Sequence, residues 1–170
     1  KYSTAILIGG GKSSTNHKKA IEKFLALDDN IVLIHVGARN INSFSYINSK
    51  QYFALIGVEN QDSLTIIGDL NSSNKFIYGP FPRKMGTTIS KNLFNMSYEL
   101  EQINFTKASN DSPFAIAAQL SLDLNVSKIL LVGFDGYDTN INQNQFLLAQ
   151  ENQKIIDDLN KIDNISLYSL

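Results

Sequence analysis

An α/β fold in three layers, with a doubly wound and mostly parallel sheet between helices, is predicted by three features of the sequence. Short apolar runs of β-type residues alternate along the chain with helical patterns. Several of these runs are apolar throughout, as expected of strands that helices cover on both faces. Glycines and helix-capping residues stand where strands turn into helices or helices start. These features are typical of a Rossmann-like domain.

Seven strands are expected from the apolar runs. They span Thr4 to Ile8, Ile31 to Val36, Tyr52 to Val58, Leu64 to Ile67, Phe76 to Tyr78, Lys128 to Val132 and Ile165 to Tyr168. The order of these strands in the sheet does not follow from the sequence.

Amphipathic patterns and a capping motif predict three helices between the strands. Residues Asn16 to Leu27 place an apolar face opposite a face of charged side chains. Ser112 followed by Pro113 is typical of an N-cap and a first helical position, and predicts a helix that ends near Leu124. The third predicted helix spans Gln145 to Leu159.

A fourth helix is predicted from Thr87 to Ile103, because apolar residues recur there at alternating spacings of four and three. These residues are Ile89, Leu93, Met96, Leu100 and Ile103. Packing in the core is the simpler explanation of the pattern. A contact between copies in a homo-oligomer is the alternative.

Length and composition limit the classes of function. The chain has 170 residues, of which 43% are hydrophobic, which is enough for one domain with a substantial core. A net charge of −1 disfavours non-specific binding to nucleic acid or to an anionic membrane. The absence of cysteine excludes thiol catalysis, disulfides and thiolate metal sites.

The ends and the hydropathy of the chain carry further expectations. No apolar run approaches the ~20 residues that cross a bilayer, and no signal peptide is recognisable, so we expect a cytoplasmic protein with no membrane partner. The chain starts at Lys1 without an initiator methionine, and its last apolar run extends to Leu170. This predicts that residues 1–170 are a single domain cut from a longer protein.

The most informative motif directly follows the first predicted strand and leads into a helical pattern. Glycines let backbone amides approach an anion closely, and the start of a helix offers unpaired N–H groups. The motif therefore predicts a site for a phosphate or a carboxylate of a small-molecule ligand. Its candidate ligand-binding residues are Gly9, Gly10, Gly11, Lys12, Ser13 and Ser14. A tight turn that uses glycine for its geometry alone is the alternative.

Two well-known glycine motifs do not fit this loop. A Walker A loop would need a glycine where the chain has Ile6. In the dinucleotide motif Gly-x-Gly-x-x-Gly, Ser14 replaces the third glycine, and no acidic residue ends the second predicted strand. The sequence thus argues against a P-loop NTPase and against an NAD site, and it leaves NADP, bound through Arg39, as a weaker alternative.

A second motif ends the sixth predicted strand, where Gly133 and Gly136 flank the Phe134-Asp135 pair. Ligands of open α/β sheets bind beyond the carboxyl ends of strands, so Asp135 and the glycine loop should share one edge if both strands are central. Asp135 could bind a ribose hydroxyl, a base or a hydrated Mg²⁺ ion, and Asp138 could join it. Capping of a turn or helix is the alternative role of Asp135.

Two further residues complete the candidate ligand-binding set. Asn40 follows the second predicted strand, and Ser112 offers its hydroxyl at a predicted helix start, where capping alone would also explain it. The chain has only two histidines, His17 and His35, and neither lies in a nucleophile-elbow motif. We expect His35 to be a hydrogen-bonded core residue. Hydrolase chemistry and histidine metal sites are therefore disfavoured, and no catalytic residue or metal ligand is assigned.

Several segments together resemble a known family. Residues 6–13, 31–40, 47–52 and 126–137, the last ending in Gly-Phe-Asp-Gly-Tyr, are similar to the C-terminal domain of bacterial proteins that resemble HMG-CoA lyase and are often labelled 4-hydroxy-2-oxovalerate aldolase-like. More distantly, the chain is similar to the hydroxymethylpterin diphosphokinase-like family and to a bacterial sialyltransferase family. The positions that match these distant families are Gly9, Gly11, Ser13 and Asp135.

The resemblance implies a division of roles. In the aldolase-like family the aldol chemistry belongs to a separate N-terminal TIM barrel with a divalent metal, so the parent protein would be a lyase and its barrel a partner of this domain. The distant families bind nucleotides at such a sheet edge, which implies a nucleotide or nucleotide-sugar ligand with Mg²⁺. The catalytic histidine of the sialyltransferases has no equivalent late in this chain.

Two functions follow as hypotheses. The first is a non-catalytic accessory domain of a putative aldolase that binds a nucleotide or another phosphate ligand. The second is a nucleotide-dependent transferase, of diphosphokinase or glycosyltransferase type, which needs an acid/base group and cations around the phosphates. For this chemistry the sequence offers only Asp135, Asp138, Lys12 and the distant pair Arg83 and Lys84. Because so few acid/base and cationic residues are available, the first hypothesis is favoured.

Overall fold

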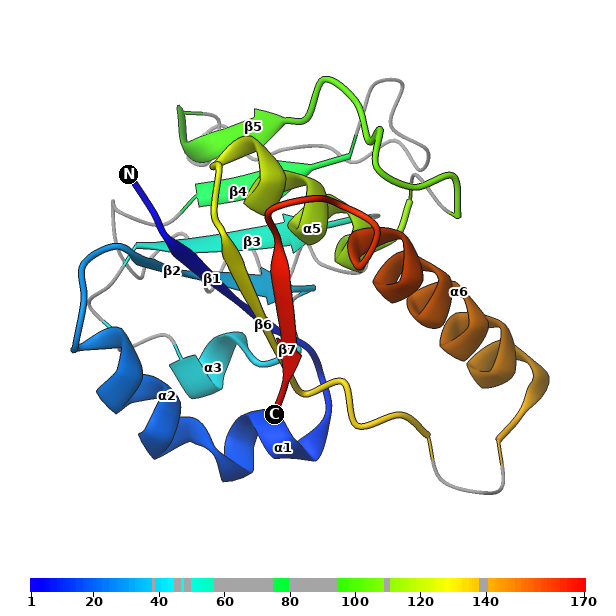
Figure 1. Ribbon diagram of the computed structural model, residues 1–170. Helices are drawn as coiled ribbons and strands as arrows, with labels where there is room; N and C mark the ends of the chain where they lie inside the picture. Colours follow the sequence, from blue (N-terminus) through cyan, green and yellow to red (C-terminus); the bar gives the residue numbers. More distant parts are fainter. Residues whose placement is uncertain are drawn as a thin grey trace.

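The structure is a computed structural model that describes residues 1–37, 39–44, 47, 50–56, 75–79, 95–108, 111–137 and 141–170. In this part of the chain, helices cover a central parallel sheet on both faces (Figure 1). The predicted three-layer α/β class is therefore confirmed, and the sheet is parallel throughout its described strands.

The sheet has seven described strands in the order β5-β4-β3-β2-β1-β6-β7. Their bounds are β1 Thr4–Ile8, β2 Ile31–Val36, β3 Gln51–Leu55, β4 Lys75–Tyr78, β5 Ser97–Glu99, β6 Lys128–Val132 and β7 Ser166–Ser169. The order reverses at β1, because β2 to β5 follow on one side of it and β6 and β7 on the other. The carboxyl ends of β1 and β6 are neighbours at this reversal, where ligands bind in open α/β sheets.

The helices form the two outer layers. One face of the sheet carries α1 (Lys12–Asn16), α2 (Lys18–Leu25) and α3 (Ile41–Phe44), and the other carries α5 (Pro113–Asp123) and α6 (Gln143–Leu159) (Figure 1). None of the described helices is long and apolar enough to cross a membrane.

The core explains why the strands read as continuous apolar runs. In β1, Ala5 and Leu7 point into the cluster beneath α5 and α6, whereas Ile6 and Ile8 point into the cluster beneath α2 and α3. All four side chains are buried. Successive residues of a strand point to opposite faces, so a strand covered on both sides needs apolar residues at every position.

Most strand predictions are confirmed, some with shifted ends. The first, second and sixth strands match β1, β2 and β6 residue for residue. The strands predicted near residues 52–58, 76–78 and 165–168 correspond to β3, β4 and β7. The strand predicted from Leu64 to Ile67 lies outside the described residues, as do residues 57 and 58.

The helix predicted from Asn16 to Leu27 is wrong at its start and in its continuity. The helical segment begins at Lys12, directly after the glycines, and His17 (φ −94°, ψ 9°) separates α1 from α2. It begins early because a carboxylate from a distant loop accepts a hydrogen bond from the Ser13 amide in the first turn of α1.

The helix predicted from Thr87 to Ile103 is wrong over its described part, since residues 97–99 form β5; residues 87–94 lie outside the described residues. Parallel pairing with β4 aligns Phe76 with Ser97, and these sheet contacts override the helical spacing of the side chains. The core role expected of the pattern is confirmed for Leu100, which is buried, and for Ile103, which packs against the main core cluster.

The two remaining helix predictions are confirmed. The Ser112 hydroxyl accepts a hydrogen bond from the Ala115 amide, and Pro113 is the first residue of α5. At the start of α6, the Asn142 side chain accepts from the Gln145 amide and the Gln145 side chain accepts from the Asn142 amide. This reciprocal capping satisfies two donors at the helix start without any tertiary contact.

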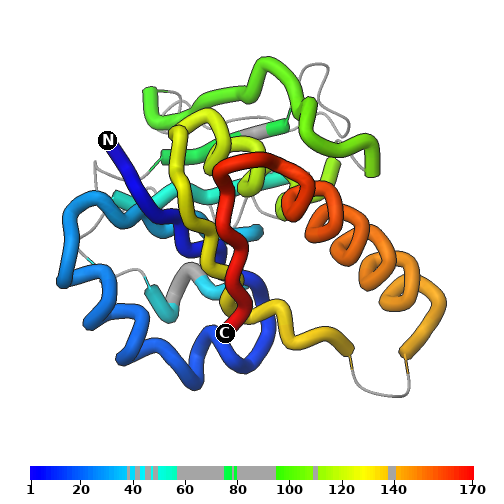
Figure 2. Tube along the Cα trace, in the orientation of Figure 1, coloured from blue at the N-terminus to red at the C-terminus, as the bar shows by residue number. Residues whose placement is uncertain are grey.

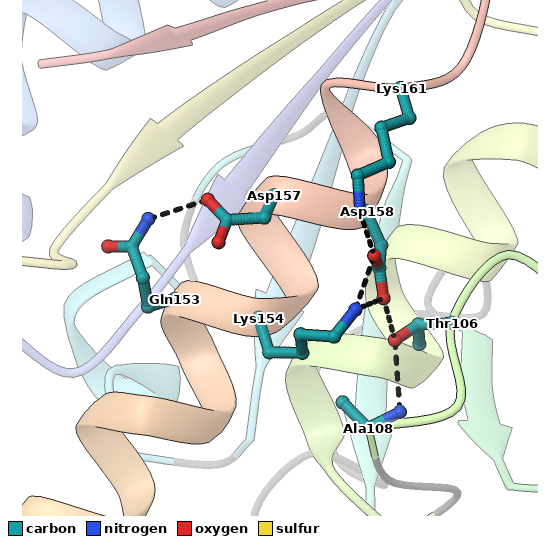
Figure 3. A network of polar contacts seen from close by, with 7 residues as sticks. All are labelled: Thr106, Ala108, Gln153, Lys154, Asp157, Asp158 and Lys161. Atoms are coloured by element: carbon teal, nitrogen blue, oxygen red, sulfur yellow. Dashed lines mark hydrogen bonds and ion pairs between the residues drawn. The ribbon is translucent and has the colours of Figure 1, made fainter.

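A polar network fixes the far end of α6 to the loop before α5 (Figure 3). The Asp158 carboxylate accepts hydrogen bonds from Lys154 Nζ at 2.6 Å, Lys161 Nζ at 2.9 Å and the Thr106 hydroxyl at 2.8 Å. These three donors hold the pKa of Asp158 well below its usual value. Thr106 also accepts from the Ala108 amide at 3.1 Å, so the network joins helix and loop.

Candidate functional site

The loops after β1 and β6 are joined by backbone hydrogen bonds. The Gly9 amide donates to Val132 O at 2.7 Å, and the Gly11 amide donates to Gly133 O at 2.8 Å. A Cβ atom at Gly9 would lie 2.5 Å from Gly133 O, and one at Gly11 would lie 2.7 Å from the same oxygen. These two glycines are therefore needed for the contact between the loops, whatever ligand the loop binds.

Asp135 closes this junction. Ser13 donates its amide to Asp135 Oδ2 at 2.8 Å and its hydroxyl to Asp135 Oδ1 in a short hydrogen bond, while the hydroxyl accepts from the Gly133 amide at 2.9 Å. The hydroxyl and amide of Ser13 hold the pKa of Asp135 below its usual value. The expectation that Asp135 and the glycine loop share one sheet edge is confirmed, and a tertiary carboxylate occupies the start of α1.

Asn40 ties the same loop to the end of β2. Its Nδ2 donates to Gly9 O at 2.6 Å and to Ser14 Oγ at 2.8 Å. The Ser14 hydroxyl donates in turn to Gly11 O at 2.6 Å, and the Ser14 residue is fully buried. Both side chains thus hold the loop in shape, Ser14 from a buried position and Asn40 from a half-buried one.

Two cations lie at the exposed side of the junction. The Arg39 side chain lies across Gly10, since a Cβ at Gly10 would be 2.7 Å from Arg39 Cδ and 3.1 Å from Arg39 Nη1. Arg39, Lys12 and Gly10 are exposed. Within the described part of the chain, neither cation forms a hydrogen bond or an ion pair, and the Gly10 amide has no partner. These donors are available to an anion.

The sequence suggests Arg39 only as a partner for a 2′-phosphate and does not predict its place across Gly10. The sequence does place Arg39 shortly after a predicted strand, as it does Gly9. This position becomes informative only when β2 is known to be the neighbour of β1. We refer to Gly9 to Ser14, Arg39, Asn40 and Asp135 as the switch-point site.

The start of α5 reaches the same edge through aromatic contacts. The Phe114 and Phe134 rings lie 4.6 Å apart, and Phe134 Cε2 would lie 3.2 Å from a Cβ at Gly9. Ser112 is buried and caps α5, so its hydroxyl is engaged within the helix start. Asp138 lies outside the described residues.

The two histidines differ in their surroundings. His35 is buried, its Nε2 lies 2.7 Å from Gln51 Oε1, and its ring stacks on Phe53 at 4.4 Å. Burial lowers the pKa of His35 to about 4. The prediction of a hydrogen-bonded core histidine is confirmed, whereas His17 is exposed. In the described ranges no three His, Asp or Glu side chains are grouped closely enough to hold a metal ion.

Comparison with known proteins adds no assignment. The chain matches no model of a protein family, and neither the curated proteins nor the solved structures include a significant match to it. The switch-point site and the motif resemblance in the sequence are therefore the features that bear on function.

Proposed function

We propose that this chain is a non-catalytic domain that binds a phosphorylated small molecule, a nucleotide or nucleotide sugar, at the switch-point site. The observation that carries the proposal is the exposed, unpaired Arg39 side chain lying across Gly10, at the point where the strand order reverses. Sites of this kind in open α/β sheets are where such ligands bind.

The chemistry of the donors supports a phosphate. The Arg39 guanidinium can donate two parallel hydrogen bonds to phosphate oxygens, and the neighbouring Gly10 amide can donate a third. Lys12, two residues after Gly10 at the start of α1, is a further exposed cation. The proposal places the phosphate at Arg39 and Gly10 rather than at the start of α1, because the Asp135 carboxylate already accepts from Ser13 there.

Asp135 favours a ligand that carries hydroxyl groups as well as phosphate. Its two oxygens accept from the amide and the hydroxyl of Ser13, and the Lys12 backbone is a third donor to this carboxylate. Because a carboxylate accepts about four hydrogen bonds in total, one position remains, for which a ribose hydroxyl is a suitable donor. If Mg²⁺ accompanies the nucleotide, its ligands would be the phosphates and water, with Asp135 as the candidate protein carboxylate.

The same contacts support a binding role rather than catalysis. Asp135 is the candidate general base, yet its hydrogen bonds with Ser13 lower its pKa and so weaken it as a base. The association with a cytoplasmic metal-dependent aldolase barrel is supported by the Gly-Phe-Asp-Gly-Tyr resemblance at residues 133–137. An assay for cleavage of 4-hydroxy-2-oxo acids by the isolated chain tests whether the aldol chemistry lies outside this domain, and we expect no turnover.

Calorimetric titration tests the binding proposal. ATP, CMP, UDP-glucose and inorganic phosphate are titrated into the chain with and without Mg²⁺, and at least one nucleotide is expected to bind more tightly than phosphate. Arg39→Ala should weaken that binding by about tenfold or more, roughly 1.4 kcal/mol. The matched control is Lys128→Ala, which removes an exposed cation at the opposite end of the strands. Equal losses in both variants, or no binding by any nucleotide, would contradict the proposal.

A further inference from the structure

The first half of α6 lacks a partner in the described fold. Phe146, Leu147 and Leu148 are 49%, 54% and 48% exposed, and Ile141 just before the helix is also exposed. The buried residues of α6 all lie in its last turns, beside the network of Asp158. Figure 2 shows this half, in orange, extending away from the sheet while the other end lies against the body. We call residues 141–150 the α6 arm.

Apolar side chains lie on more than one side of the arm. Consecutive residues of an α-helix are separated by about 100°, so Phe146, Leu147 and Leu148 spread over more than half of its circumference. A helix that only covers a core has a single apolar stripe. The arm is therefore suited to be enclosed by a surface that the described part of this copy does not provide.

A second apolar surface, on the edge strand β7, lacks a covering helix. Tyr168 in β7 is 51% exposed, and Leu170 beyond it is 64% exposed. Tyr168 is in register with Leu130, which packs with the cluster beneath α2 and α3, so the two side chains share that face. The exposure of Tyr168 shows that this part of β7 is left open, although parallel sheets are normally covered on both faces. We call Leu130, Tyr168 and Leu170 the β7 face.

The arm cannot cover the β7 face of its own chain. Leu167 and Ile155 belong with the opposite core cluster, so α6 packs on the other side of the sheet. Within its described residues, one copy therefore exposes an apolar helix that no surface covers and an apolar sheet face that no helix covers. A second copy supplies both.

We infer that the protein forms a two-fold symmetric dimer in which the α6 arm of each copy covers the β7 face of the other. Charge supports a second copy as the occupant, because residues 141–150 and 164–170 contain no charged side chain. Symmetry brings these segments together without like-charge repulsion or an unpaired buried charge. The reciprocal exchange makes two equal contacts and closes the assembly, as two-fold interfaces do.

Sedimentation of the full chain and of two matched variants tests the dimer. The wild-type chain should sediment as a dimer, and Leu147→Glu should convert it to a monomer with unchanged circular dichroism, because Leu147 is exposed within one copy. Leu27→Glu makes the same change at another exposed leucine, outside the arm and the β7 face, and should leave the dimer intact. A wild-type monomer at millimolar concentration, or equal effects of both variants, would overturn the inference.

Disulfide trapping tests the geometry, because the natural chain has no cysteine. A mixture of the Leu147→Cys and Tyr168→Cys variants should give a covalent dimer on mild oxidation, whereas neither variant alone should do so. Cross-linking by Leu147→Cys alone would show a helix-to-helix dimer instead and overturn the exchange. A dimer that no cysteine pair traps would overturn it as well.

Discussion

At the scale of single residues, Ser13 joins two loops that are far apart in the sequence. Its hydroxyl accepts from Gly133 and donates to Asp135, and its amide donates to the other carboxylate oxygen. We predict that Ser13→Ala lowers the free energy of unfolding by about 1 kcal/mol, as loss of a helix cap does. Urea denaturation measures the change. Thr15→Ala, which removes a local hydroxyl bond within α1, is the control and should cost less; equal losses would contradict the role of Ser13.

His35 makes stability depend on pH. Its pKa is about 4 in the folded chain and ~6.5 when unfolded, so the unfolded chain binds a proton first as pH falls. The contribution of His35 to stability should be complete above ~6.5, decrease as pH falls toward 4, and level off below it, with a total loss of about 3 kcal/mol. The midpoints of urea denaturation, measured between pH 7 and 4 in about 20 mM buffer at constant ionic strength, test this dependence. His35→Phe should flatten the dependence and His17→Gln should not, and a slope that survives His35→Phe would contradict it.

At the scale of elements, adjacent glycines of the β1–α1 loop have separable roles. A methyl at Gly9 would meet the backbone of Gly133, which cannot move aside, whereas a methyl at Gly10 would meet the flexible side chain of Arg39. Gly9→Ala should therefore cost about 2 kcal/mol of stability. Gly10→Ala should cost little stability but displace Arg39 and weaken nucleotide binding. Thermal denaturation and calorimetry of the two variants measure both effects, and an equal loss of stability in both would contradict the distinction.

At the scale of the whole molecule, the sequence predicts the layers better than their connections. Continuous apolar runs predict buried parallel strands, and the motif around Asp135 predicts the edge that it shares with Gly9 to Ser14. The start of α1 does not follow from the sequence, because its capping carboxylate lies 122 residues away from Ser13 in the chain. The β5 segment was misread because pairing with β4 is a tertiary contact. The position of Arg39 beside Gly10 follows only from the order of the strands, which apolar patterns do not encode.

The central claim is that the switch-point site binds a nucleotide, and an amide chemical-shift titration tests it most directly. With the tightest nucleotide from calorimetry, the amides of Gly10, Gly11 and Arg39 should shift and saturate together. The amides of Lys128 and Ser166, at the amino ends of β6 and β7, should remain unchanged. Saturating shifts confined to the amino ends of the strands, or no shifts at millimolar nucleotide, would contradict the account.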